Sequence, residues 1–110
     1  MANTFKNAAL ANVNNSAYST LYTAPSSTTT VVLGLAIANK TANGVEVQVQ
    51  FTDSSASTTH QLLENGSIPG KTTLETRAGQ KYILEAGDIL KVQADTASAL
   101  DVVLGVMEIT

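Results

Sequence analysis

The sequence contains no cysteine, a single histidine and few charged residues. Without cysteine no disulfide can form, so a small domain must be stabilised by its core or by assembly with other chains. The same absence leaves His60 without the partners of a zinc site or a Cys/His catalytic pair. Charged residues make up 14% of the chain, against a usual share of about 25%. The polarity comes instead from Ser, Thr and Asn, which suit strands and turns better than helices.

Positive charge is sparse, and long apolar runs are absent. Six Lys and Arg residues stand singly along a chain with a formal net charge of −3, so no basic stripe exists to neutralise nucleic-acid phosphates. No run of about 18 apolar residues predicts a membrane span. Residues 1–7 lack the basic segment and apolar run of a secretory signal. We therefore expect neither nucleic acid nor membrane as a partner, and we expect folding in a cytoplasm.

The clearest structural signal is residues 45–51, where apolar and polar residues alternate without a fault. Successive side chains of a strand point to opposite faces, so this pattern predicts a half-buried strand. Residues 89–94 alternate in the same way, with Leu90, Val92 and Ala94 expected to face inward. Further strands are predicted at residues 18–23, 30–38, 58–64, 72–76, 81–84 and 100–109.

These strands recur at intervals of roughly 8–12 residues, a spacing typical of an all-β sandwich or barrel. The predicted fold is a jelly-roll-like antiparallel β-sandwich of about eight or nine short strands. Residues 17–110 form this single domain, and residues 1–16 form an extended N-terminal arm, with a short edge strand as an alternative. The arm lies either on its own sheet or on that of a neighbour.

Turn-forming residues separate the predicted strands. Residues 39–44 contain Asn43-Gly44, which is well suited to positive φ, so residues 30–38 and 45–51 are predicted to form an antiparallel hairpin. Residues 85–88 predict a tight turn. Residues 65–66 are expected to close the strand before them, and residues 68–70 to form an exposed turn.

Two strands, residues 30–38 and 100–109, are apolar on both faces. In the first, a large face (Val31, Leu33, Leu35 and Ile37) opposes a small face (Val32, Gly34, Ala36 and Ala38). The second faces pack against the arm, against another subunit, or inside one sandwich of unequal sheets. If these second faces were exposed in a monomer, they would form a larger apolar patch than soluble monomers usually tolerate. This favours self-association. The predicted subunit contacts are Phe5, Leu10, Val32, Ala36, Val103, Met107 and Ile109.

Candidates for chemistry are few. His60 could belong to a Ser/His/Asp triad, but no nucleophile elbow accompanies it, and a solvated strand histidine explains it. Glu85 and Asp88 around Gly87 could bind calcium, although their spacing matches no EF-hand loop. Tyr18, Tyr22 and Tyr82 could line a sugar-stacking patch or lie at buried edges of the sandwich. We therefore expect no catalytic residue, no metal site, no cofactor and no enzymatic activity.

The sequence also resembles a group of small structural proteins of tailed bacteriophages of marine bacteria and cyanobacteria. The resembling elements span Tyr22 to Ile109. They are Leu21-Tyr22-Thr23-Ala24-Pro25, the strand ending Ile37-Ala38-Asn39-Lys40-Thr41, residues 45–53 with Ser54-Ser55, Leu84-Glu85-Ala86-Gly87-Asp88-Ile89-Leu90-Lys91-Val92, and the closing Met107-Glu108-Ile109. These motifs mark strands and turns, and residues up to Val13 fall outside them.

The resemblance implies a non-enzymatic virion protein assembled in the bacterial cytoplasm. The leading hypothesis is a capsid decoration or cement protein on the outer head surface. Its partners would be further copies of itself, in a trimer for example, and the major capsid protein or other virion proteins. The alternative is a tail, baseplate or fibre module that binds host-surface carbohydrate, for which an exposed aromatic pair beside carboxylates or amides would be the distinguishing feature.

Overall fold

The computed structural model describes residues 3–75 and 82–110. These residues form nine β-strands and no helix, and hence no helix that could cross a membrane. The strands are β1 (Asn3–Leu10), β2 (Ser19–Thr23), β3 (Thr29–Asn39), β4 (Val45–Asp53), β5 (Thr58–Ile68), β6 (Thr73–Glu75), β7 (Tyr82–Leu84), β8 (Ile89–Ala94) and β9 (Leu100–Ile109).

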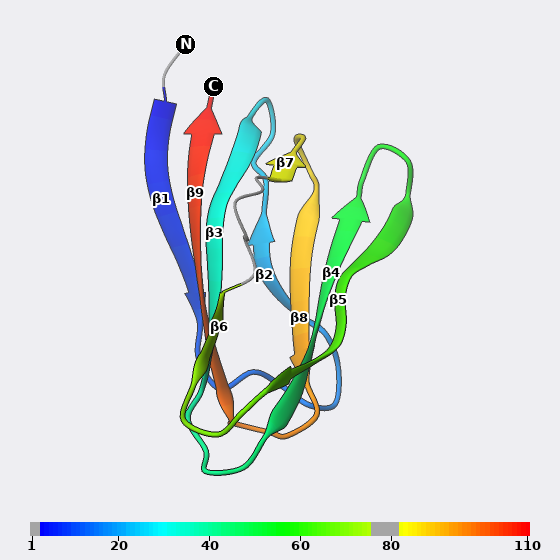
Figure 1. Cartoon of the computed structure of the whole chain (residues 1–110). Helices are drawn as coiled ribbons and strands as arrows, with labels where there is room; N and C mark the ends of the chain where they lie inside the picture. The colour runs from blue at the N-terminus through cyan, green and yellow to red at the C-terminus, as the bar shows by residue number, and fades with distance from the viewer. Residues whose placement is uncertain (1–2, 76–81) are drawn as a thin grey trace.

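Two antiparallel sheets face each other (Figure 1). The five-stranded sheet has the order β1-β9-β3-β6, with β7 also paired to β3, and the four-stranded sheet has the order β2-β8-β4-β5. Most connections therefore cross from one sheet to the other. This order is that of a jelly roll in which β6 and β7 occupy one edge position. The prediction of an all-β, jelly-roll-like sandwich is confirmed.

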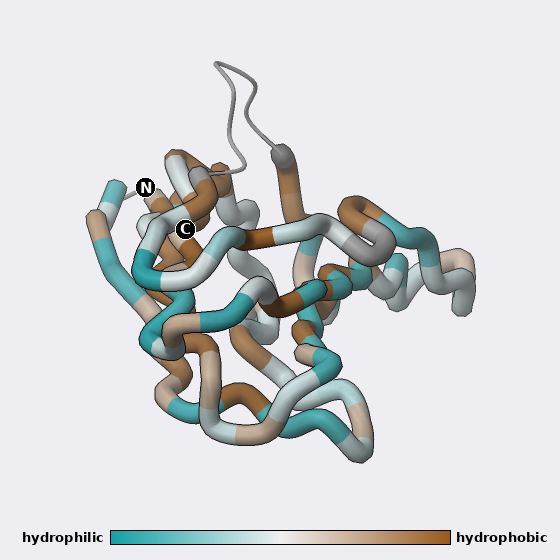
Figure 2. Tube along the Cα trace, turned by 60° about the horizontal axis from the view of Figure 1, so that its bottom comes forward, coloured by the Kyte–Doolittle hydropathy of each residue, from teal (hydrophilic) through white to brown (hydrophobic). Residues whose placement is uncertain are grey.

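The alternation read from the sequence decides which residues enter the core. On β4, Val45, Val47 and Val49 are buried between the sheets, while Glu46 is exposed. Leu90, Val92 and Ala94 of β8 are buried as predicted. Hydrophobic and hydrophilic segments consequently alternate along the chain trace (Figure 2). Burial of apolar area at about 25 cal/mol per Å2 is what holds the two sheets together.

The N-terminal segment forms part of the five-stranded sheet. β1 lies at its edge and pairs with β9 over eight residues, from Asn3 opposite Ile109 to Leu10 opposite Val102. The loop that follows is tied to the sandwich by Val13, which is fully buried and whose N–H donates to the Leu100 carbonyl at 3.0 Å. The segment expected as an arm thus lies on its own chain's sheet, as the strand beside β9.

The predicted hairpin between residues 30–38 and 45–51 is wrong, because β3 and β4 lie in different sheets. Neither Asn43 nor Gly44 has a positive φ. The loop is instead organised by the buried Asn39 amide, whose nitrogen donates to the carbonyls of Asn43 at 2.8 Å and Ile68 at 2.9 Å. These bonds hold the loop in the conformation that connects β3 of one sheet to β4 of the other.

A β-bulge in β3 overturns the predicted division of that strand into a large and a small face. The pairing with β9 shifts between Val32 and Gly34, so strict alternation fails there. Val32, Leu35 and Ile37 are buried between the sheets, whereas Val31 and Ala36 are only partly buried. Val32, predicted on the small face, therefore shares the inner face with Leu35 and Ile37, and Val31, predicted on the large face, shares the outer face with Ala36.

Two boundaries also differ from the prediction. β5 continues through residues 65–66 to Ile68, with register irregularities opposite β4. Ile68 is 1% exposed and belongs to the core, so residues 68–70 are not a wholly exposed turn. The predicted positions Thr76, Ala78-Gly79 and Lys81 lie outside the described residues.

Candidate interaction surface

An apolar row crosses the outer face of the five-stranded sheet. Phe5 of β1 lies opposite Met107 of β9, Met107 opposite Val31 of β3, and Val31 opposite Ile83 of β7. Directly opposed residues of antiparallel strands share a face, so these four side chains form one line across four strands. Phe5 is 73% exposed and Ile83 is 55% exposed.

A second row runs parallel to the first. Ala9, Val103 and Ala36 lie opposite one another on β1, β9 and β3, and Val103 is 52% exposed. Between the rows Asn7, Gly105 and Gly34 lie opposite one another on β1, β9 and β3, and a Cβ added at Gly105 would meet nothing within 4 Å. The surface is therefore low at its centre. We call these residues the apolar face: Phe5, Ala9, Val31, Ala36, Ile83, Val103, Met107 and Ile109.

The apolar face contains five of the seven subunit contacts predicted from the sequence: Phe5, Ala36, Val103, Met107 and Ile109. The other two, Val32 and Leu10, are corrected by the structure. Val32 is 2% exposed, because the bulge in β3 points it inward. Leu10 is an odd number of residues from Phe5 and so faces the opposite side of β1, where it packs against the core. Val32 therefore offers a partner no open surface, and Leu10 is partly buried against the core of its own chain.

The outer face of the four-stranded sheet has the opposite character. Gln48 and Gln93 lie opposite each other on β4 and β8, and Gln50 lies opposite Lys91. Glu46 and Thr20 are exposed on the same side. We call this the amide face. The molecule therefore presents one apolar and one hydrophilic sheet, a contrast that sequence analysis missed because it depends on which strands become neighbours.

A polar network connects the two sheets near the loop between β2 and β3. The Tyr22 hydroxyl donates to Glu108 Oε2 at 2.5 Å and lies 3.0 Å from Thr30 Oγ1. Lys6 Nζ lies 3.2 Å from Glu108 Oε1, and the Glu108 side chain is only 7% exposed. The network joins β2 of one sheet to β1, β3 and β9 of the other. Lys6 also places an inward-pointing charge on an edge strand, which discourages unwanted pairing there.

Burial, followed by the hydrogen bond to Glu108, raises the pKa of Tyr22 to about 12. The Tyr22 hydroxyl, and then Lys6, hold the pKa of Glu108 below its ordinary value. A carboxylate whose folded-state pKa is lowered contributes stability above its unfolded pKa, and that contribution is lost as pH falls through the folded pKa.

We therefore expect the stabilisation from Tyr22 to fade in acid. Thermal melting of the wild type and of Tyr22→Phe should differ most near neutral pH, and the difference should shrink in acid, as the pH falls through the lowered pKa of Glu108. Asp53 and Asp101, whose pKa values are also lowered, contribute equally to both proteins and cancel in the difference. A difference that stays constant between neutral and acid pH would contradict this role of Glu108.

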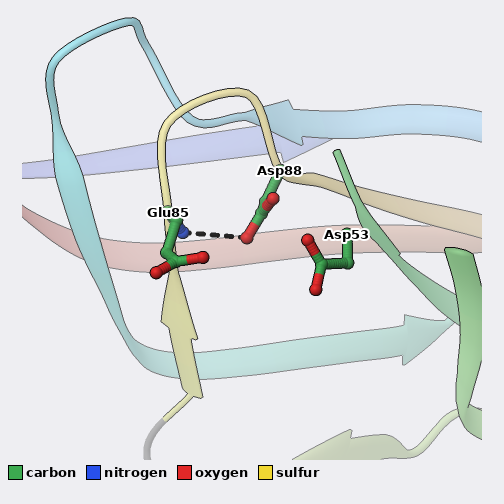
Figure 3. Close-up of side chains that lie close together, drawn as sticks. All are labelled: Asp53, Glu85 and Asp88. Carbon is green, nitrogen blue, oxygen red and sulfur yellow. Dashed lines mark hydrogen bonds between the residues drawn. The ribbon is translucent and has the colours of Figure 1, made fainter. Parts of the chain in front are cut away.

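Three carboxylates, Asp53, Glu85 and Asp88, come together beside the turn between β7 and β8 (Figure 3), with oxygens within 4.8 Å of one another. The calcium alternative named only Glu85 and Asp88. However, one oxygen of Asp88 accepts the Ser54 N–H at 3.0 Å and the other the Glu85 N–H at 2.9 Å. Because Asp88 is 2% exposed and both its oxygens are engaged, its structural role is to join two turns.

The remaining candidates for chemistry lie apart. His60 is exposed on β5, stacks on Phe51 with ring centroids 6.5 Å apart, and lies 3.1 Å from Thr58 Oγ1. Tyr18 bonds Gln48 on the amide face, whereas Tyr22 reaches Glu108 between the sheets. The described residues therefore do not bring Tyr18 and Tyr22 together as an aromatic pair.

No protein-family model and no curated protein sequence matches this chain. Among solved structures, it is similar to a subunit of Bacillus endospore appendages, described as disulfide-linked pili, with a TM-score of 0.59 and 9% identity over 98% of this chain and 88% of that one. It is also similar to a capsid protein of Helicobacter pylori bacteriophage KHP30, with a TM-score of 0.57 and 15% identity over 98% and 87% of the two chains.

A third similarity is to VP2 of infectious bursal disease virus, with a TM-score of 0.51 and 8% identity, covering 96% of this chain but 32% of that one. At these identities the similarity establishes the fold. This chain has no cysteine, so it cannot form the disulfide links described for the appendages. The chain therefore has a β-sandwich fold that is also found in capsid and pilus subunits.

Proposed function

We propose that this protein is a non-enzymatic structural subunit of a phage virion, and specifically a decoration or cement protein on the outer surface of the head. The apolar face carries the proposal. Three of its side chains, Phe5, Ile83 and Val103, are more than half exposed and lie in register on one side of one sheet. Large apolar side chains that are exposed together on one face are typical of a protein contact.

The apolar face and the amide face would have different roles in such a subunit. The apolar face would lie against the major capsid protein or against further copies of this chain, where covering Phe5, Val103 and Met107 removes apolar surface from water. The amide face would remain in solvent. A single copy need bind only weakly, because many copies bridging capsomer boundaries act together against the pressure of packaged DNA.

The similarity to capsid and pilus subunits supports a structural role through the fold, which in those proteins is compatible with assembly into large particles. The resemblance of residues 22–109 to phage structural proteins supports the virion as the particle.

Quantitative mass spectrometry of separated heads and tails from disrupted virions tests the proposal. We expect hundreds of copies of this chain per particle, all in the head fraction. A few tens of copies or fewer, in the tail fraction, would overturn the decoration role and favour a tail or baseplate module. Absence of the chain from both fractions would overturn a virion role altogether.

A further inference from the structure

A shallow cavity of about 140 Å3 opens on the amide face. It lies where β4 begins, where β8 ends, and beside the loop that connects β1 to β2. Its lining residues are Asn15, Glu46, Gln48, Gln93, Ala94 and Asp95. All of them except Ala94 are polar, and they come from three separate parts of the chain.

Hydrogen bonds hold the walls of this cavity in place without a ligand. The Asp95 N–H donates to the Glu46 carbonyl at 3.0 Å, and the Glu46 N–H donates to Asp95 Oδ1 at 3.1 Å. Gln93 Nε2 donates to the Asn15 carbonyl at 3.1 Å, and the Ala94 N–H donates to the Asn14 carbonyl at 3.2 Å. Because these hydrogen bonds already order the cavity walls, binding would cost little further conformational entropy, which favours affinity.

The cavity offers the donors and acceptors that a polyhydroxylated ligand needs. Side-chain amides both donate and accept, and ionised carboxylates accept from hydroxyl groups. Glu46 is exposed, and no side-chain hydrogen bond or ion pair engages its carboxylate within residues 3–75 and 82–110. Beyond Gln48, the Tyr18 hydroxyl bonds that glutamine and accepts from Gln61 Nε2 at 3.3 Å, which extends the polar surface past the cavity.

The charge of the site limits the class of ligand. Glu46 and Asp95 on its wall, in a chain of net charge −3, disfavour phosphates and other anions. The volume is well below the roughly 300–1,000 Å3 of pockets that enclose drug-sized ligands, so a ligand would enter by one small unit only. A neutral sugar residue at the end of a glycan meets both conditions.

We propose that this cavity binds a single neutral sugar unit, with Glu46, Gln93 and Asp95 as its hydrogen-bonding groups. Because little of the ligand is enclosed, the dissociation constant of one site is expected to be on the order of 1 mM. On a surface that carries many copies of the chain, such weak sites would act together. The proposal concerns the isolated chain and does not depend on where the protein is located.

The test is a titration of the full-length protein with glucose, galactose, mannose and N-acetylglucosamine, followed by two-dimensional 1H–15N NMR. With at least one sugar we expect saturable shifts of the backbone signals of Glu46 and Asp95 and of the side-chain amide of Gln93. Gln93→Ala should weaken binding about tenfold or more. Gln50→Ala, a glutamine on the same face outside the cavity lining, is the matched control and should bind as the wild type does.

Glu46→Gln provides a second variant, since it changes only an exposed side chain and should leave folding intact while weakening binding several-fold. The proposal is overturned if none of the four sugars shifts these signals up to about 100 mM, or if Gln93→Ala and Gln50→Ala behave alike. Shifts of the same signals by calcium chloride alone would likewise overturn it, because they would assign the carboxylates to a cation.

Discussion

Replacement of Asp88 by alanine is expected to lower the free energy of unfolding by about 2–4 kcal/mol. The Asp88 carboxylate accepts the N–H groups of Ser54 and Glu85, so it joins the turn after β4 to the turn before β8. Hydrogen bonds to a charged acceptor are stronger than neutral ones, and alanine would leave both N–H groups without this partner. The tight turn at residues 85–88, with Gly87 at φ +88°, would lose its anchor.

Asp53→Ala is the matched control for this prediction, because Asp53 belongs to the same carboxylate cluster. Its Oδ1 accepts from the Ser55 hydroxyl at 2.9 Å and from the Ala56 N–H at 3.3 Å, both of which belong to its own turn. Urea denaturation of both variants should show a large loss of stability for Asp88→Ala and a small one for Asp53→Ala. Equal losses, or a stabilised Asp88→Ala, would show that Asp88 does not join the two turns in this way.

Val103→Asp is expected to weaken self-association by about 30-fold or more while leaving the fold intact. Val103 lies in the second row of the apolar face, between Ala9 and Ala36, and is 52% exposed, so aspartate at this position remains hydrated in the isolated chain. In a contact made through the apolar face, the same carboxylate would be buried without a partner, which is costly. Sedimentation velocity over a range of protein concentrations measures the effect.

Thr20→Asp is the control, because it adds the same charge to an exposed position on the amide face. Its sedimentation should match that of the wild type. Met107→Asp, in the neighbouring row, should behave as Val103→Asp does. If the wild type forms an oligomer that survives both substitutions on the apolar face, copies of the chain do not associate through it.

Regular alternation made part of the fold predictable from the sequence. β4 and β8 are half-buried strands whose inward residues, such as Val47 and Val92, could be identified from period-two patterning alone. Turn chemistry was also informative at residues 85–88, where the Asp88 N–H donates to the Glu85 carbonyl and Gly87 supplies the positive φ.

Features that depend on tertiary contacts could not be read in the same way. The bulge at Val32 and Gly34 shifts the alternation of β3, so Val32 was predicted as a contact residue but is buried. Asn43-Gly44 resembles a hairpin turn, yet the buried Asn39 amide directs the chain to the other sheet. A local sequence signal does not determine which sheet receives the next strand.

The apolar face and the cavity on the amide face also depend on tertiary contacts and could not be predicted from the sequence. Phe5 and Met107 are about a hundred residues apart in the sequence and become neighbours only through the pairing of β1 with β9. The sequence could place Val103 and Met107 on the second, outer face of their strand, but it could not predict their alignment with Ile83. The cavity on the amide face, built from Asn15, Glu46 and Asp95, has no signature in any one segment.

Hydroxyl-radical footprinting of this chain in intact virions, compared with the free chain, tests the role of the apolar face most directly. Met107 and Phe5 report on that face, and methionine is readily oxidised when accessible. Tyr18 and His60, away from the apolar face, serve as internal references. The expected result is protection of Phe5 and Met107 in the particle with unchanged reactivity of Tyr18 and His60. Equal oxidation of Phe5 and Met107 in the two samples would contradict burial of the apolar face on assembly.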